Sequence, residues 1–184
     1  MNDLMIDIET LDTCNTAIIV SIAAVEFDLK AAFMNKEFYE IINLKSYNSN
    51  LLKDKFSSSL DTIKWWLQQS KEAQNIFDKK LQEDNSLPIT FALAKLVKTF
   101  NFKSYERIWS KGSNFDFPIL EHAFKQHPSG LEVPWHYSQL CDMRTVSKLS
   151  GLKFKNNTHN ALDDCYSQIN QLVEALKIIK GKSK

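Results

Sequence analysis

Three stretches near the start of the chain carry the apolar, β-branched pattern that is typical of strands. Residues 1–8 alternate weakly and end in acidic side chains, as a central strand that reaches the edge of a sheet would. Residues 17–28 are rich in isoleucine and valine and predict a second strand. Residues 34–43 predict a third, joined to the second by a turn at 29–33. We expect the three strands to form a meander.

Apolar residues recur at helical spacing over much of the remaining chain. Capping residues and prolines mark where several helices would start, and one short β-rich run interrupts them. In chain order we expect a helix after the caps at 57–61, a helix at 88–100, a strand at 105–110, a helix from Ser113 or Asn114, and a helix at about 161–179. This order indicates an α/β or α+β domain with a mixed sheet.

Composition and length exclude some classes of protein. With 184 residues, 43% hydrophobic and 24% charged, the chain resembles an ordinary soluble protein. We expect one domain at 1–180 and a polar tail at 181–184. No apolar run is long enough to cross a bilayer and no secretory signal is visible, so we expect no membrane partner. Three cysteines without metal-type spacing favour idle thiols and a cytoplasmic location.

The formal net charge is only +1, from 23 basic and 22 acidic residues. Proteins that coat long stretches of duplex usually carry a large basic excess, because each phosphate contact releases counterions. If the partner is a nucleic acid, near-neutrality therefore favours a short footprint, such as one strand end held in a pocket.

The first candidate for chemistry is the pair Asp7 and Glu9. Residues two apart on a strand point to the same face, so both carboxylates would project together from the end of a buried strand. Two crowded acids repel each other unless a cation lies between them, and Mg²⁺ and Mn²⁺ prefer oxygen ligands. The alternative is two solvated acids where a strand leaves the sheet, and for an isolated pair this alternative is the more common one.

The second candidate is Asp116 in the first turn of a predicted helix. The helix dipole favours an acid there, so helix capping is the simple alternative to a metal ligand. The flanking Phe115 and Phe117 are core residues in the simplest interpretation, or one of them stacks on a terminal base.

The third candidate combines His159, just before the last helix, with two acids in its first turn, Asp163 and Asp164. A histidine in that position can approach a reacting water while an acid behind it binds a metal. The alternative is a helix start enriched in aspartate, with His159 on the surface. Because Asp163 and Asp164 flank the apolar stripe about equally, helical periodicity leaves open which of them faces the site.

Joined in one chain, the three motifs resemble those of the DEDDh (DnaQ-like) 3′–5′ exonucleases: Asp7-x-Glu9, Asn114-Phe115-Asp116 and His159-x-x-x-x-Asp164. This is the superfamily of the DNA polymerase proofreading subunit and oligoribonuclease. Order and spacing agree over residues 1–176, and the joint occurrence outweighs the alternatives for single motifs. The resemblance implies an α/β, RNase H-like fold with a central mixed five-stranded sheet flanked by helices.

Finer features are similar to one branch, the group of phage exodeoxyribonuclease A, exonuclease VIII-like enzymes and mycobacterial-type exoribonucleases. The segments that carry this likeness are 62–66, 109–112 and 141–145. The branch contains both DNA and RNA enzymes, so the preferred sugar stays open. Adjacent Trp65 and Trp66 cannot share one helix face; either one of them lines a substrate groove, for which we take Trp66, or both are core. Within 141–145, Asp142 and Arg144 form an ion pair or contact a phosphate, and the ion pair is favoured.

The resemblance also implies a mechanism. It predicts two Mg²⁺ or Mn²⁺ ions, with Asp7 bridging, Glu9 and Asp164 on the nucleophile side and Asp116 on the other. His159 would be the general base, since its ordinary pKa suits that task. The predicted substrate is the 3′ end of single-stranded DNA or RNA, and the predicted products are nucleoside 5′-monophosphates. Residues expected to contact it are Thr10, Leu11, Trp66, Asn114 and Phe115.

Two other functions compete with this one. An RNase H-like endonuclease also clusters carboxylates on such a sheet, although the pairing of His159 with Asp164 favours the exonuclease. A catalytically silent nucleic-acid-binding module would use the acids as caps only. Many small members of the superfamily are homodimers, and the sequence shows no interface signature for or against a homodimer.

Overall fold

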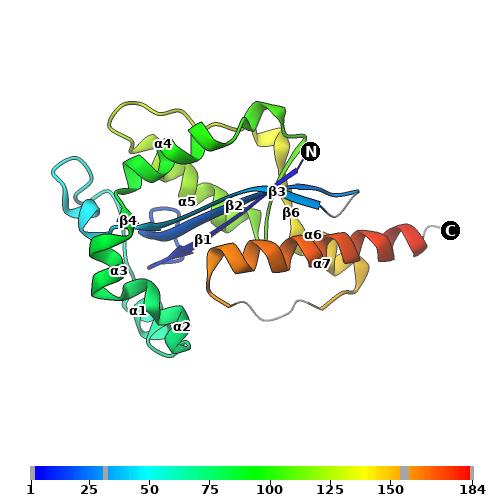
Figure 1. Ribbon diagram of the computed structural model, residues 1–184, viewed down its shortest axis with the longest axis horizontal. Helices are drawn as coiled ribbons and strands as arrows, with labels where there is room; N and C mark the ends of the chain where they lie inside the picture. Colours follow the sequence, from blue (N-terminus) through cyan, green and yellow to red (C-terminus); the bar gives the residue numbers. More distant parts are fainter. Residues whose placement is uncertain (1–2, 31–32, 154–157, 183–184) are drawn as a thin grey trace.

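A six-stranded mixed sheet forms the centre of the computed structural model, which describes residues 3–30, 33–153 and 158–182. The strands are β1 (Asp3–Thr10), β2 (Ile19–Asp28), β3 (Phe33–Ile42), β4 (Ser86–Leu87), β5 (Arg107–Ser110) and β6 (Leu140–Asp142). Their order across the sheet is β4-β3-β2-β1-β5-β6. The first three strands form the predicted antiparallel meander, and β4, β5 and β6 each pair in parallel with a neighbour (Figure 1).

The sheet has six strands rather than the five that the resemblance implies. Strands β4 and β6, with two and three residues, lie at its edges. Neither is long enough to show a period-two pattern, so the sequence predicted neither. The predicted turn at 29–33 includes residues 31 and 32, which are outside the described residues, as are residues 1 and 2 of the first predicted strand.

The main helices are α1 (Leu60–Trp66), α2 (Lys71–Gln74), α3 (Lys79–Asp84), α4 (Ile89–Thr99), α5 (Ser113–Lys125), α6 (Met143–Ser150) and α7 (Ala161–Lys182). Short 3₁₀ turns are η1 (Leu44–Asn48), η2 (Asn75–Phe77), η3 (Phe102–Ser104) and η4 (Tyr137–Gln139). Helices α1, α4, α5 and α7 were predicted, as was strand β5, although α7 runs beyond the predicted end at 179 and into the predicted tail. Helix α6 was not predicted, despite an Asp142 side chain that caps its start and Gly151 in a left-handed conformation at its end.

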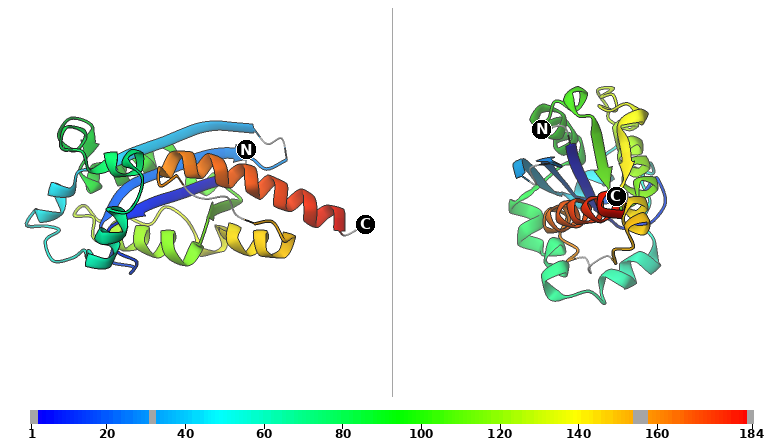
Figure 2. Two further views of the ribbon diagram at one scale, coloured as in Figure 1. Left: turned by 90° about the horizontal axis from the view of Figure 1, so that it is seen from below. Right: turned by 90° about the vertical axis from the view of Figure 1, so that its right-hand side faces the viewer.

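Helices cover both faces of the sheet, with α4 and α5 on one face and α6 and α7 on the other (Figures 1 and 2). Strand β1 is buried along its whole length and alternates between the two cores. Leu4, Ile6 and Ile8 pack with α4 and α5, whereas Met5 packs with α6 and α7. The α7 face of β1 therefore changes from apolar at Met5 to acidic at Asp7, where the strand approaches its carboxyl end.

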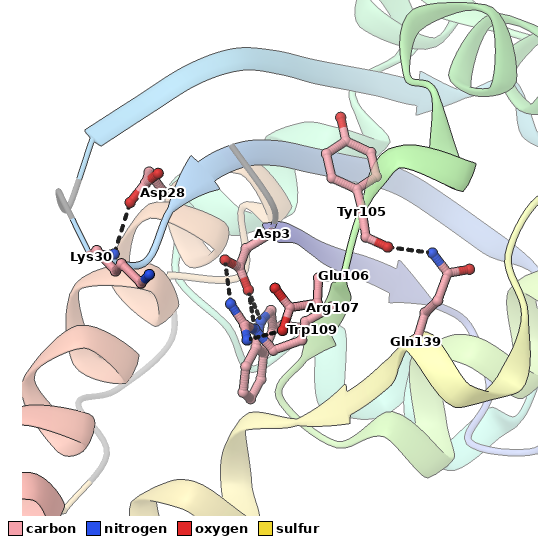
Figure 3. Close-up of polar contacts among 8 residues, drawn as sticks. All are labelled: Asp3, Asp28, Lys30, Tyr105, Glu106, Arg107, Trp109 and Gln139. Atoms are coloured by element: carbon pink, nitrogen blue, oxygen red, sulfur yellow. Dashed lines mark hydrogen bonds and ion pairs between the residues drawn. The ribbon is translucent and has the colours of Figure 1, made fainter.

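A buried polar cluster fixes β5 beside the start of β1 (Figure 3). Asp3 is 1% exposed and accepts hydrogen bonds from Arg107 Nε at 2.6 Å, Arg107 Nη2 at 3.1 Å and Trp109 Nε1 at 2.8 Å. Gln139 donates to the carbonyl of Tyr105 just before β5. These bonds set the parallel register of β1 and β5, which carries the start of α5 to the acidic end of β1.

Among the helices formed by the described residues, none combines the length and apolar character that crossing a bilayer requires.

Candidate active site

Five side chains that the sequence singled out meet at the carboxyl end of β1. Asp7 and Glu9 extend from β1, Asp116 from the first turn of α5, Asp164 from the first turn of α7, and His159 from the preceding loop. All but Asp164 line a pocket of about 590 Å³. Ligand atoms of Glu9, His159 and Asp164 lie within 4.8 Å of one another, close enough to share one metal ion.

The tertiary structure selects Asp164 over Asp163. The Asp164 carboxylate is 1% exposed and accepts hydrogen bonds from Thr158 N at 2.8 Å, Thr158 Oγ1 at 3.1 Å and His159 N at 3.3 Å. Asp163 points to solvent beside a separate pocket. His159 adopts a left-handed backbone conformation with φ of 59°, which is uncommon for a residue other than glycine. Thr158 and His159 therefore lie against the Asp164 carboxylate, and His159 lines the pocket.

Asp116 connects α5 to β1 directly. Its Oδ1 accepts a hydrogen bond from the backbone N–H of Ile8, at 3.3 Å. Ile8 stands between Asp7 and Glu9, so this bond brings the third carboxylate against the other two. Residues more than a hundred positions apart thus form one acidic cluster.

Three carboxyl groups of the cluster, those of Asp7, Glu9 and Asp116, have raised pKa values and resist ionisation. Burial raises the pKa of Glu9 to about 8, and the charges of Asp164 and Asp116 add to the effect. Burial likewise raises the pKa of Asp116 to about 7 and, with the charges of Asp116 and Glu9, the pKa of Asp7 well above its ordinary value. A hydrogen bond from Gln168 acts in the opposite direction on Asp7. Buried acids of this kind fit divalent cations, whose charge offsets both burial and repulsion.

His159 is held against aromatic rings. Its imidazole packs edge-on to Trp65, with ring centroids 4.8 Å apart. Partial burial lowers its pKa, and the charge of Lys111 adds to this, while Asp164 acts in the opposite sense. The ring is therefore neutral at pH 7, the form in which a histidine can accept a proton.

Of the five residues predicted to contact the substrate, two line the pocket and three do not. Thr10 and Phe115 line the pocket, whereas Leu11 and the exposed Asn114 do not. The choice of Trp66 was wrong: it is 2% exposed, and its Nε1 donates to the carbonyl of Thr10 at 2.9 Å. Trp65 is 40% exposed and lines the pocket. Because the two tryptophans are adjacent on a helix, they cannot both face the pocket. The hydrogen bond of Trp66 to Thr10 determines that Trp66 is the buried one and Trp65 lines the pocket.

Three residues near the site were missed or misassigned. Asp142 caps α6 through the N–H groups of Arg144 and Thr145, and no ion pair of the described residues joins it to the guanidinium of Arg144. Arg144 Nη2 instead donates to the carbonyl of Lys111, and both residues line the pocket. Gln168, which donates to Asp7, follows Asp164 by four positions, and this spacing places both side chains on one helix face.

The fold and this set of side chains are those of the DEDDh class of nucleases, in which four carboxylates and a histidine gather at the edge of an RNase H-like sheet. Residues 2–176 match the Rv2179c-like 3′–5′ exoribonuclease domain, and the chain belongs to this family.

An exodeoxyribonuclease of enterobacteria phage T4 is 27% identical over 129 residues, which are 65% of this chain and 54% of that protein. The chain thus spans about half the length of this curated relative.

Three solved structures share the fold at low identity. Escherichia coli exonuclease I in complex with a dA16 oligonucleotide has a TM-score of 0.63 and 13% identity, over 97% of this chain and 42% of that one. The nuclease domain of 3′hExo, a DEDDh family member bound to rAMP, has a TM-score of 0.58 and 14% identity, over 95% and 91%. The Mg²⁺- and Mn²⁺-bound form of Schizosaccharomyces pombe Pop2p has a TM-score of 0.58 and 11% identity, over 94% and 81%.

Proposed function

We propose that this chain is a metal-dependent exonuclease that hydrolyses phosphodiester bonds at the 3′ end of single-stranded DNA or RNA and releases nucleoside 5′-monophosphates. The observation that carries the proposal is that ligand atoms of Glu9, His159 and Asp164 lie within 4.8 Å of one another, at a pocket that Asp7, Glu9, Asp116 and His159 line. Membership of the exoribonuclease domain family and the likeness to a phage exodeoxyribonuclease support it.

Asp7, Glu9, Asp116 and Asp164 would hold two Mg²⁺ or Mn²⁺ ions, because their oxygens are the ligands that these cations prefer. The raised pKa values of Asp7, Glu9 and Asp116 reflect buried carboxylates that lack a compensating positive charge. The metal-bound form of Pop2p supports the same choice of cation. When bound, such a pair of ions supplies an activated water and offsets charge on the attacking and leaving oxygens.

His159 is the general base of the proposal. Its neutral ring takes the proton from the attacking water, and its lowered pKa keeps it unprotonated at neutral pH. The edge-on contact with Trp65 and the bond from its backbone N–H to Asp164 hold the imidazole at the pocket. Thr10, Phe115 and Trp65 offer surface to the terminal nucleotide. A ring exposed like that of Trp65 can stack on any base, which fits removal without sequence preference.

The nuclease domain of this proposal takes in residues 1–180 and acts in the cytoplasm. The structures with oligonucleotide and nucleotide bound support a nucleic-acid partner. A homodimer is an alternative to a monomer, and light scattering on the purified protein separates the two.

The experiment incubates the protein with Mg²⁺ or Mn²⁺ and matched 5′-labelled RNA and DNA strands, and resolves the products on a sequencing gel. A ladder that shortens from the 3′ end, with 5′-monophosphates released, supports the proposal and identifies the preferred sugar. Cleavage of a circular single strand would instead indicate an RNase H-like endonuclease. Absence of cleavage by folded, metal-loaded protein would favour a binding module.

A further inference from the structure

We propose that Arg144, held by the Lys111–Gly112 backbone, is a binding residue for a backbone phosphate of the substrate strand. The inference rests on the proposed nuclease function and adds the site that attracts the polyanion. Arg144 lines the pocket together with Asp116, and its positive charge lowers the pKa of that carboxyl. The guanidinium therefore lies within electrostatic reach of the acidic cluster.

The charges of the pocket show why such a residue is needed. Two divalent cations would balance the charges of the four clustered carboxylates. Asp12 and Asp61 also line the pocket, and without further positive charge they would repel a strand. The basic residues among the described lining are Lys111 and Arg144, apart from the neutral imidazole of His159. Attraction of phosphate at this pocket therefore depends on these two side chains.

Local geometry holds the Arg144 guanidinium in place. Its Nη2 donates to the carbonyl of Lys111 at 3.0 Å. A Cβ atom at Gly112 would lie 3.3 Å from Nη2 and 3.5 Å from Cζ, so glycine leaves the room that the flat group occupies. Gly112 also has φ of 127°, a conformation that other residues rarely adopt. Since a guanidinium carries five N–H donors, the bond to Lys111 leaves capacity for a two-point contact to phosphate.

The use of arginine in this chain points the same way. Of 23 basic residues only two are arginines, Arg107 and Arg144. Arg107 donates hydrogen bonds from Nε and Nη2 to the two carboxylate oxygens of Asp3 (Figure 3). Arg144 lines the pocket, where its guanidinium could donate two parallel hydrogen bonds to two oxygens of one phosphate. A lysine ammonium lacks this planar pair of donors.

The test measures binding of fluorescent single strands with phosphorothioate 3′-terminal linkages, in Mg²⁺ and over a range of salt concentrations. Arg144→Ala should weaken the Kd about tenfold or more and reduce the slope of log K against log[salt] by about 0.7, the value for one lost single-strand contact. Arg144→Lys should keep the slope and recover part of the affinity. Lys98→Ala, an exposed lysine of α4 outside the pocket, should change neither.

A purely structural role for Arg144 predicts a different outcome. It would lower the Tm while the salt slope stayed at the wild-type value, and that result would overturn the proposal. Should Arg144→Ala fail to fold, Arg144→Gln replaces it, since an amide can still donate to the Lys111 carbonyl without a charge. Wild-type hydrolysis of unmodified strands is measured in parallel: its absence would refute the nuclease function, whereas an unchanged salt slope in active variants would refute only the role of Arg144.

Discussion

Gln168 donates a hydrogen bond from its side-chain amide to Oδ1 of Asp7, over 2.7 Å, between two buried side chains. The bond lowers the pKa of Asp7 against the larger effects of burial and neighbouring charge. One turn earlier on α7, Asp164 faces the same cluster. The helix thus supplies both a carboxylate and the donor that favours ionisation of another carboxylate.

Gln168→Leu should weaken Mn²⁺ binding about tenfold, because Asp7 loses the donor that stabilises its charged form and fixes its rotamer. The Tm should change little, since Gln168 Oε1 is a buried acceptor without a partner in the described part of the chain and its removal relieves that cost. Calorimetric titration measures the affinity. Gln171→Leu, one turn further on α7, is the matched control, and an equal loss of affinity in both variants would contradict the role of Gln168.

Single substitutions of the two adjacent aspartates of α7 should have different effects on activity. Asp164→Asn should reduce kcat/KM by more than about 100-fold, because one carboxylate oxygen of a candidate metal site becomes an amide. Asp163→Asn should stay within about threefold of the wild type, because its side chain is exposed and outside the catalytic pocket. Steady-state hydrolysis of a 5′-labelled strand measures both. The opposite order of activities would mean that the third motif is read in the wrong register.

The metal-free protein should lose stability as the pH rises. The pKa of Glu9 is raised from 4.5 to about 8 and that of Asp116 from 3.8 to about 7. Between these limits the unfolded chain has released protons that the folded protein retains, so the free energy of unfolding falls with increasing pH. Since one pKa unit corresponds to about 1.4 kcal/mol, we expect a loss of several kcal/mol, or on the order of 10 °C in Tm, across this window.

Thermal melting in EDTA at a series of pH values measures this loss. Added Mn²⁺ should remove most of it, because a bound cation favours the ionised carboxylates. A Tm that increases with pH through the same window, in EDTA, would show that the cluster is not protonated in the folded protein.

The two tryptophans of α1 should respond differently to truncation. Trp66→Ala should cost about 3–5 kcal/mol of stability, because it empties a buried site and leaves the carbonyl of Thr10 without its Nε1 donor. Trp65→Ala should leave the Tm nearly unchanged but raise KM, since Trp65 is exposed in the pocket and packs on His159. Melting curves and steady-state kinetics test the pair, and similar effects of both variants on the Tm would contradict the division.

The sequence alone predicts the elements that have a long, regular pattern. Strands β1 to β3 and helices α4, α5 and α7 are long enough for the period of two or 3.6 residues to emerge. It also determined that Asp7 and Glu9 share a face, because that follows from strand geometry alone. Edge strands β4 and β6 were not predicted, because segments of two or three residues show no pattern and form strands only by pairing with a neighbouring strand.

Which side chains meet depends on contacts between the elements. The parallel pairing of β1 with β5 brings Asp116 to the backbone of Ile8, and Thr158 donates to Asp164 rather than to Asp163. Trp65 lines the pocket, whereas Trp66 is buried and donates a hydrogen bond to the carbonyl of Thr10. These cases share one cause. Local periodicity sets the direction of a side chain relative to its own element, whereas its partners depend on contacts between elements far apart in the chain.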